Sequence, residues 1–103
     1  MKSDTTERVY DIVAKIPQGK VMTYKAVAVK AGRINPRLVG VILHQNSDPQ
    51  KVPCHRVVRS DGKIANGYAF GGKVAQLTRL RKEGVVFSNA GTVDLVKSSW
   101  NVA

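Results

Sequence analysis

The sequence predicts a mainly α-helical domain with small β elements and a helix-turn-helix. Apolar residues recur at helical spacing near the start of the chain, and two helix-start signals precede two short segments that a glycine turn separates. The stretches with strand propensity are all short. With 103 residues, 43% of them hydrophobic, the chain suits one domain that folds without disulfides. We therefore expect residues 1–103 to form a single domain.

The first helix is predicted close to the N-terminus. Asp4 and Glu7 are spaced as in a capping box. Four apolar residues follow at the spacing that places them on one helix face: Val9, Ile12, Val13 and Ile16. The helix should end at Pro17-Gln18-Gly19, because proline and glycine both disfavour its continuation. A short extended stretch is expected at Val21-Met22.

Two short helices are predicted next. Thr23 is a suitable N-cap for a helix over residues 24–31, which Gly32 ends. Asn35-Pro36 then supplies the N-cap and the first-turn proline of a helix that runs to about Gln45. Such a pair is typical of DNA-binding helix-turn-helix motifs, although many small helical proteins contain one without binding DNA.

The second helix of this pair is predicted to have two distinct faces. Its polar face carries Arg37, Gly40 and His44, and the residues expected to be buried are Leu38, Val41 and Ile42. A glycine inside a helix costs about 1 kcal/mol relative to alanine. Gly40 therefore indicates close approach, either by another part of the protein or by a nucleic acid.

The C-terminal half is predicted to contain a strand, a helix and a hairpin. In chain order we expect a strand over Arg56–Arg59, a turn at Ser60-Asp61-Gly62, a helix from about Lys73 to Lys82, its end at Glu83-Gly84, and hairpin strands at 85–87 and 92–96 around Asn89-Ala90-Gly91. Trp100 is expected to pack beneath that hairpin.

The charge of the chain points to a polyanionic partner. There are 17 Lys and Arg against 7 Asp and Glu, and 13 of these cations lie between Lys20 and Lys82, where the only acids are Asp48 and Asp61. DNA, RNA and acidic lipid all fit such a charge, and a solvated basic surface is the remaining explanation. Because the N-terminal residues have no apolar core and no run is long enough to span a membrane, we expect neither a signal peptide nor a membrane span, and one cysteine permits no internal disulfide. We expect a cytoplasmic protein, or a nuclear one in a eukaryote.

Cys54 is the residue with the clearest chemical potential. A lone cysteine is most often a small buried hydrophobic residue, and a nucleophilic one needs a base or a positive field nearby. His55 and Arg56 provide both kinds of group. On an extended segment, however, adjacent side chains point to opposite faces. Proton transfer from Cys54 would then need a bridging water or a base from elsewhere in the fold.

The segment around Cys54 resembles a known active-site motif. Val52-Pro53-Cys54-His55-Arg56-Val57-Val58 is similar to the Pro-Cys-His-Arg-Val motif of the 6-O-alkylguanine-DNA alkyltransferases. Further matches follow the family's order and spacing: Gly19 to Tyr24, Arg37 to Gly40, Asn46 eight residues before Cys54, Gly67-Tyr68 and Glu83-Gly84. The resemblance covers about residues 7–87 as a core, with a hairpin and tail at 88–103. It implies a winged helix-turn-helix-like DNA-binding domain.

The resemblance also implies a mechanism and a set of site residues. Double-stranded DNA containing alkylated guanine is the implied partner, and the damaged base is rotated out of the stack. Cys54 then takes the alkyl group once per molecule, with no metal or organic cofactor. The implied catalytic residues are Cys54, His55, Glu83, Tyr24 and Asn46. The implied DNA contacts are Arg37, Gly40, Thr23, Tyr24 and Arg56, and the implied pocket residues are Val52, Pro53, Tyr68 and Ala69.

Three departures from the pattern keep a second function open. We expect the chain to correspond to the family's active-site domain alone and to be a monomer. Gln76 stands where many transferases have a lysine, and Lys73 lies one turn earlier. The length and tail resemble the alkyltransferase-like proteins, which bind alkylated DNA and recruit excision-repair proteins without repair. That group typically lacks the cysteine, so Cys54 favours transfer.

Two further classes explain less of the sequence. A winged-helix regulator with an inert cysteine predicts sequence-dependent binding to undamaged DNA. A thiol hydrolase would use Cys54 and His55, but no motif for an oxyanion hole accompanies them.

Overall fold

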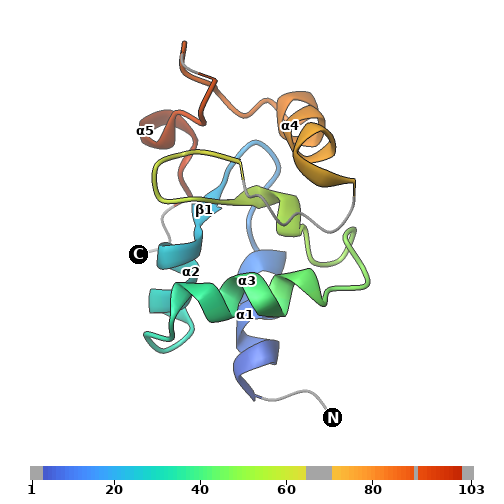
Figure 1. Ribbon diagram of the computed structural model, residues 1–103, viewed down its shortest axis with the longest axis vertical. Coiled ribbons are helices and arrows are strands. Elements are labelled where there is room, and N and C mark those ends of the chain that lie inside the picture. The colour runs from blue at the N-terminus through green and yellow to red at the C-terminus, as the bar shows by residue number, and fades with distance from the viewer. Residues whose placement is uncertain (1–3, 65–70, 90, 101–103) are drawn as a thin grey trace.

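The computed structural model describes residues 4–64, 71–89 and 91–100 (Figure 1). Its elements, in chain order, are α1 (Asp4–Ala14), β1 (Met22–Thr23), α2 (Tyr24–Lys30), α3 (Pro36–His44), a 3₁₀ turn (Cys54–Arg56), β2 (Val57–Val58), α4 (Gly72–Lys82) and α5 (Leu95–Ser98). The predicted class, mainly helical with small β elements, is confirmed. None of the helices in the described part of the chain is both long and apolar enough to span a membrane.

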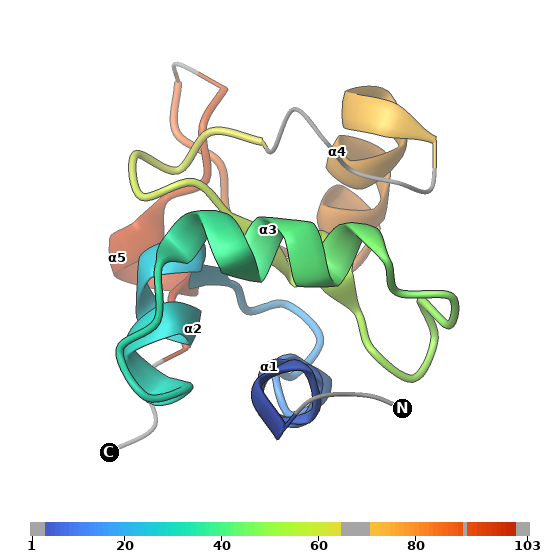
Figure 2. The ribbon, with the colours of Figure 1, turned by 60° about the horizontal axis from the view of Figure 1, so that its bottom comes forward.

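Helices α1, α2 and α3 pack together as one layer of the molecule. Figure 2 shows α3 lying across the other two. Apolar side chains from all three helices meet there and are shielded from solvent, among them Val9, Val13, Val27, Val39 and Leu43. The stripe predicted for α1 is mostly correct, since Val9, Val13 and Ile16 are fully buried and Ile12 is partly buried.

The helix-turn-helix forms through local signals in the sequence. Thr23 caps α2, since its Oγ1 accepts a hydrogen bond of 3.0 Å from the N–H of Ala26. Asn35 caps α3 in the same way, through a bond of 2.9 Å from the N–H of Arg37. Between the helices the chain turns through Gly32 and Arg33, which have φ values of 106° and 62°. These predictions are confirmed.

The buried face of α3 differs from the prediction. Val39, Ile42 and Leu43 point into the core, whereas Leu38 and Val41 are 40% and 54% exposed. The spacing of 39, 42 and 43 is a regular helical stripe, so the prediction chose the wrong face for two apolar residues. The apolar side chains of α3 thus lie on two faces of the helix, one packed in the core and one exposed.

The sheet joins this helical layer to the rest of the chain. β1 and β2 run parallel, with Met22 paired to Val57 and Thr23 to Val58. The strand predicted over Arg56–Arg59 is therefore too long: Arg56 belongs to the 3₁₀ turn, and the N–H of Arg59 bonds instead to Lys63 O at 3.0 Å. Beyond the sheet, a second apolar cluster links α4 to the C-terminal segment: Val21, Val58, Leu80, Val85 and Val93.

The C-terminal segment combines a short hairpin with a helix. Phe87 pairs with Val93 in an antiparallel bridge, as a hairpin requires, but α5 begins at Leu95 where a strand was predicted. Asp94 causes the change, because its carboxylate caps α5 by accepting from the N–H groups at positions 96 and 97. Trp100 packs against the core of α1–α3 rather than beneath the hairpin. Its backbone N–H donates a hydrogen bond to the backbone oxygen of Val21 at 2.8 Å.

Candidate functional site

The 3₁₀ turn Cys54–Arg56, called the cysteine turn below, carries the reactive sulfur. Cys54 is 6% exposed. Asn46 orders the loop that leads into the turn: its Nδ2 donates to Val52 O at 2.8 Å, and its Oδ1 accepts from the N–H of Asp48 at 3.1 Å. The turn brings the thiol to a fixed place beside the helical layer.

Glu83, at the end of α4, holds the two residues that follow Cys54. Its Oε2 lies 3.0 Å from His55 Nε2. Its two oxygens also accept from Arg56, Oε1 from Nε at 2.9 Å and Oε2 from Nη2 at 2.7 Å. The remaining guanidinium nitrogen of Arg56 donates to Ile16 O at 2.6 Å. Arg56 is thus engaged within the protein, and its role as a DNA contact stays a prediction.

The environment keeps His55 neutral and Glu83 ionised at neutral pH. Burial lowers the pKa of His55, and this outweighs the opposite effect of Glu83. Burial alone would raise the pKa of Glu83, but hydrogen bonds from Arg56 and His55 bring it below 4.5. A carboxylate only accepts hydrogen bonds, so Nε2 of His55 carries the proton and Nδ1 is left as a basic nitrogen. Nδ1 is buried and has no hydrogen-bond partner among the described residues, and Nε2 lies 3.0 Å from Glu83 Oε2 without the alignment of a full hydrogen bond.

The thiol itself is held mainly in its protonated form. Burial raises the pKa of Cys54, while the Asn46 side chain, the backbone N–H groups of the turn and the charge of Arg79 lower it in part. Burial likewise raises the pKa of Tyr24 from 10.0 to about 12, helped by the nearby Cys54. At neutral pH Tyr24 is therefore a hydrogen-bond donor.

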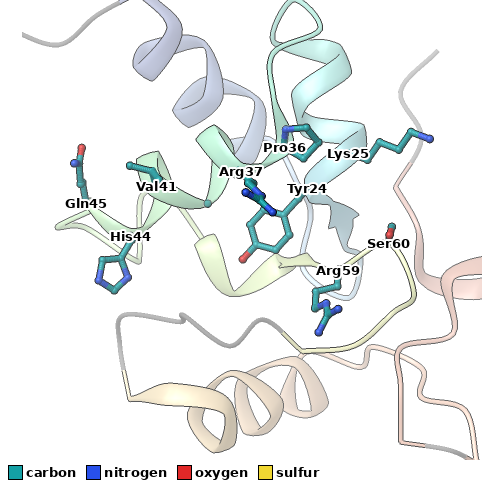
Figure 3. Close-up of a pocket in the computed structure, with 10 residues that line it drawn as sticks. Tyr24, Lys25, Pro36, Arg37, Val41, His44, Gln45, Arg59 and Ser60 are labelled. Carbon is teal, nitrogen blue, oxygen red and sulfur yellow. The ribbon is translucent and has the colours of Figure 1, made fainter.

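A groove of about 850 Å³ opens between α2, α3 and the turn after β2 (Figure 3). Its described lining residues are Tyr24, Lys25, Pro36, Arg37, Gly40, Val41, His44, Gln45, Arg59 and Ser60. Three of these are Lys or Arg, and none of them is acidic. The apolar walls of such a groove suit a nucleobase, and its positive charges suit the phosphates on either side of that nucleobase.

Gly40 leaves the floor of this groove open. A Cβ built at this position would lie 3.9 Å from Tyr24 Cε1, an ordinary van der Waals distance. Contacts with the described residues therefore do not require glycine here, so of the two explanations for Gly40, approach by a nucleic acid is the better supported.

Comparison with known proteins identifies the family. Residues 4–85 match the family model described as the 6-O-methylguanine DNA methyltransferase, DNA binding domain. The chain belongs to this family. The predicted alkyltransferase resemblance and fold class are thereby confirmed.

The relatives carry two kinds of name. The chain is 46% identical to the methylated-DNA–protein-cysteine methyltransferase of Methanothermobacter thermautotrophicus, over 76% of this chain and 43% of that protein. It is 40% identical to the DNA base-flipping protein of Escherichia coli, over 92% of this chain and 73% of that one. The chain spans less than half the length of the methyltransferases it matches.

A solved structure matches nearly the whole chain. The Schizosaccharomyces pombe protein Atl1, in complex with damaged DNA containing O6-carboxymethylguanine, superposes with a TM-score of 0.81 and 33% identity. The match covers 99% of this chain and 100% of that one. Members of the alkyltransferase family are thus found bound to damaged DNA.

The remaining predicted site residues of this alkyltransferase-family chain do not line the groove or lie outside the described residues. Thr23 uses its hydroxyl as the cap of α2, outside the groove lining. Val52 and Pro53 are buried and also absent from that lining, while Val52 borders a second cavity of about 420 Å³ next to Asn46. Tyr68 and Ala69 lie outside the described residues.

Several groove residues were missed by the sequence interpretation. Lys25, His44 and Arg59 line the groove together with Tyr24 and Arg37. His44 had been placed on the right helix face without a role, and the basic middle of the chain was the only signal for Lys25 and Arg59. Arg59 enters the groove because the chain turns immediately after β2.

Proposed function

We propose that the protein repairs DNA by accepting an alkyl group from 6-O-alkylguanine onto Cys54. The observation that supports this most directly is the buried Cys54 followed by His55, whose imidazole lies 3.0 Å from Glu83. His55 Nδ1 takes the thiol proton through a bridging water, and Glu83 stabilises the imidazolium that results. The thiolate is the stronger nucleophile.

The transfer is an in-line displacement at the alkyl carbon. The Cys54 Sγ–carbon bond forms as the carbon–oxygen bond to guanine breaks, and the electron pair leaves with the guanine oxygen. Tyr24, which stays protonated at neutral pH, donates toward the base as that negative charge develops. The thioether does not regenerate the thiol, so each molecule reacts once.

In this proposal the damaged base enters the groove and reaches Cys54 past Tyr24, which lines the groove and lies near the thiol. Base pairing hides the exocyclic oxygen inside the duplex, so the base must be rotated out before it reacts. Arg37 is exposed on the first turn of α3 and fills the space that the base leaves, while Lys25 and Arg59 bind phosphates. The relative bound to damaged DNA supports binding of such DNA by this fold.

The deciding experiment uses duplex DNA with one 6-O-methylguanine. After incubation, mass spectrometry of the peptide that contains Cys54 should show one added methyl group. The matched control is the same duplex with unmodified guanine, which should leave the peptide unchanged. Tight binding to the lesion with no added mass would exclude transfer.

A damage sensor is the second candidate function. It is supported by the near-complete match to Atl1, by the relative named as a base-flipping protein, and by burial that raises the pKa of Cys54. A sensor flips the alkylated base into the same groove and recruits excision repair. The methyl-transfer experiment separates the two functions, because only the transferase changes the mass of the protein.

A further inference from the structure

Gln76 is a fully buried polar residue that neither the groove nor the proton relay uses. It lies on α4, and its Nε2 donates to two carbonyl oxygens, that of His55 at 3.0 Å and that of Val57 at 3.1 Å. Its exposed fraction is 0%. One amide group thus binds the backbone on both sides of Arg56.

The two carbonyl oxygens fix the orientation of this amide, and this orientation leaves the amide oxygen without a hydrogen-bond partner among the described residues. Both carbonyls only accept hydrogen bonds, so the NH₂ group must face them. Oε1 is then left in the interior with no hydrogen-bond partner among the described residues. An apolar residue of the same length would avoid that unsatisfied oxygen, so filling space does not explain the choice of glutamine.

Gln76 acts on the same segment as Glu83. The two residues are seven positions apart on one face of α4, with Glu83 holding the His55 and Arg56 side chains while Gln76 holds the backbone. The backbone N–H groups of Cys54 and His55 lower the pKa of the thiol, although the Cys54 N–H also donates to Val52 O at 2.8 Å. A shift of the cysteine turn would move these groups away from the sulfur.

We propose that Gln76 is a positioning residue whose amide fixes the backbone of the cysteine turn against α4 and so sets the reactivity of Cys54. This inference rests on the proposed function for its biological meaning, although it concerns the free protein. The other charged or titratable groups near the thiol are Tyr10 on α1, Tyr24 on α2, Arg79 on α4 and His55 itself.

The test measures the rate at which iodoacetamide alkylates Cys54 as a function of pH. The chain has one cysteine, so the added mass reports on this residue alone. Gln76→Met keeps the length of the side chain and removes both donors. We expect the midpoint of its pH profile to rise by about one unit, which lowers the alkylation rate at neutral pH about tenfold. The control is Gln18→Met, at an exposed position, which should match the wild type.

Gln76→Glu gives a second, independent reading. Its carboxylate repels the two carbonyls, whereas the protonated acid donates to one of them. We expect its His55 ring signals in NMR to match the wild type at low pH and to depart from it as the carboxyl ionises. Thermal unfolding of every variant is recorded alongside.

The outcomes separate positioning from simple stability. A lower unfolding temperature with an unmoved pH profile in Gln76→Met would overturn the proposal, and so would failure of both variants to fold. Methyl transfer from a 6-O-methylguanine duplex is measured with the same proteins. If the wild type transfers no methyl group, the proposed function fails, while the iodoacetamide profile still decides the role of Gln76.

Discussion

The groove along α3 and the cysteine turn differ in how the chain builds them. The groove takes most of its lining from residues 24–45, is open to solvent and is shaped by two helix caps. The cysteine turn is buried and depends on residues distant in sequence, Gln76 on α4 and Glu83 directly after it. The proposed DNA recognition and the proposed chemistry on the sulfur therefore depend on different parts of the fold, with Tyr24 shared between them.

Under the proposed function, this separation accounts for the two kinds of relative in the family. Relatives of the chain include proteins named as methyltransferases and proteins named as base-flipping proteins. A groove that does not rely on the thiol can bind a flipped base whether or not transfer follows. Substitutions in the two regions should therefore affect different measurements.

The largest expected effect comes from removing the sulfur. Cys54→Ala should abolish methyl transfer completely and leave the affinity for lesion-containing duplex within about twofold of the wild type, because Cys54 is absent from the groove lining. Transfer is measured by mass spectrometry and affinity by fluorescence anisotropy. Ser88→Ala, at an exposed position, is the control. A parallel loss of binding would show that the two regions are coupled.

The next effect comes from the carboxylate behind His55. Glu83→Gln should lower the transfer rate by about 10²-fold, because His55 loses the charge that stabilises its protonated form. Single-turnover kinetics measure this rate. Affinity for the lesion should change little. An unaltered rate would exclude His55 and Glu83 from the proton relay.

The same variant should change how stability depends on pH. The pKa of Glu83 is lower in the folded protein than its ordinary value of 4.5, so the folded state favours the ionised form. The contribution of Glu83 to the free energy of unfolding is therefore complete above pH 4.5 and is lost as the pH falls through the lower pKa of the folded state. Between about pH 5 and 3, Glu83→Gln should lose stability less steeply than the wild type, as measured by urea unfolding.

The sequence predicted the two helices that border the groove better than it predicted the contacts of the cysteine turn. Caps at Thr23 and Asn35 are local signals, and they placed α2 and α3 correctly. Leu38 and Val41 were assigned to the core because an apolar residue in a helix looks the same whether it faces protein or a groove. Nothing local reveals that Arg56 bonds to Glu83, since 27 residues separate the pair.

A moderate effect is expected from the arginine at the start of α3. Arg37→Ala should reduce extrusion of the base about tenfold, as reported by a fluorescent base analogue beside the lesion, and should weaken binding to undamaged duplex much less. The comparison is Lys25→Ala, which removes a phosphate contact and should weaken all duplexes alike, with a slope against log salt that is smaller by about one. Equal losses of extrusion and of general binding in Arg37→Ala would reduce Arg37 to a phosphate contact as well.

The smallest effect is expected from a substitution in the groove that should change the stability of the protein and its affinity for DNA in opposite directions. Gly40→Ala adds a methyl group at an ordinary contact distance from Tyr24, so the free protein should gain up to about 1 kcal/mol from the better helix propensity. The same methyl group stands in the groove, where it should weaken affinity for lesion-containing duplex a few-fold. Urea unfolding and anisotropy measure the two quantities on one variant. A gain in stability without a loss of affinity would mean that DNA does not approach α3 at Gly40. The proposal that DNA binds along this helix would then be wrong.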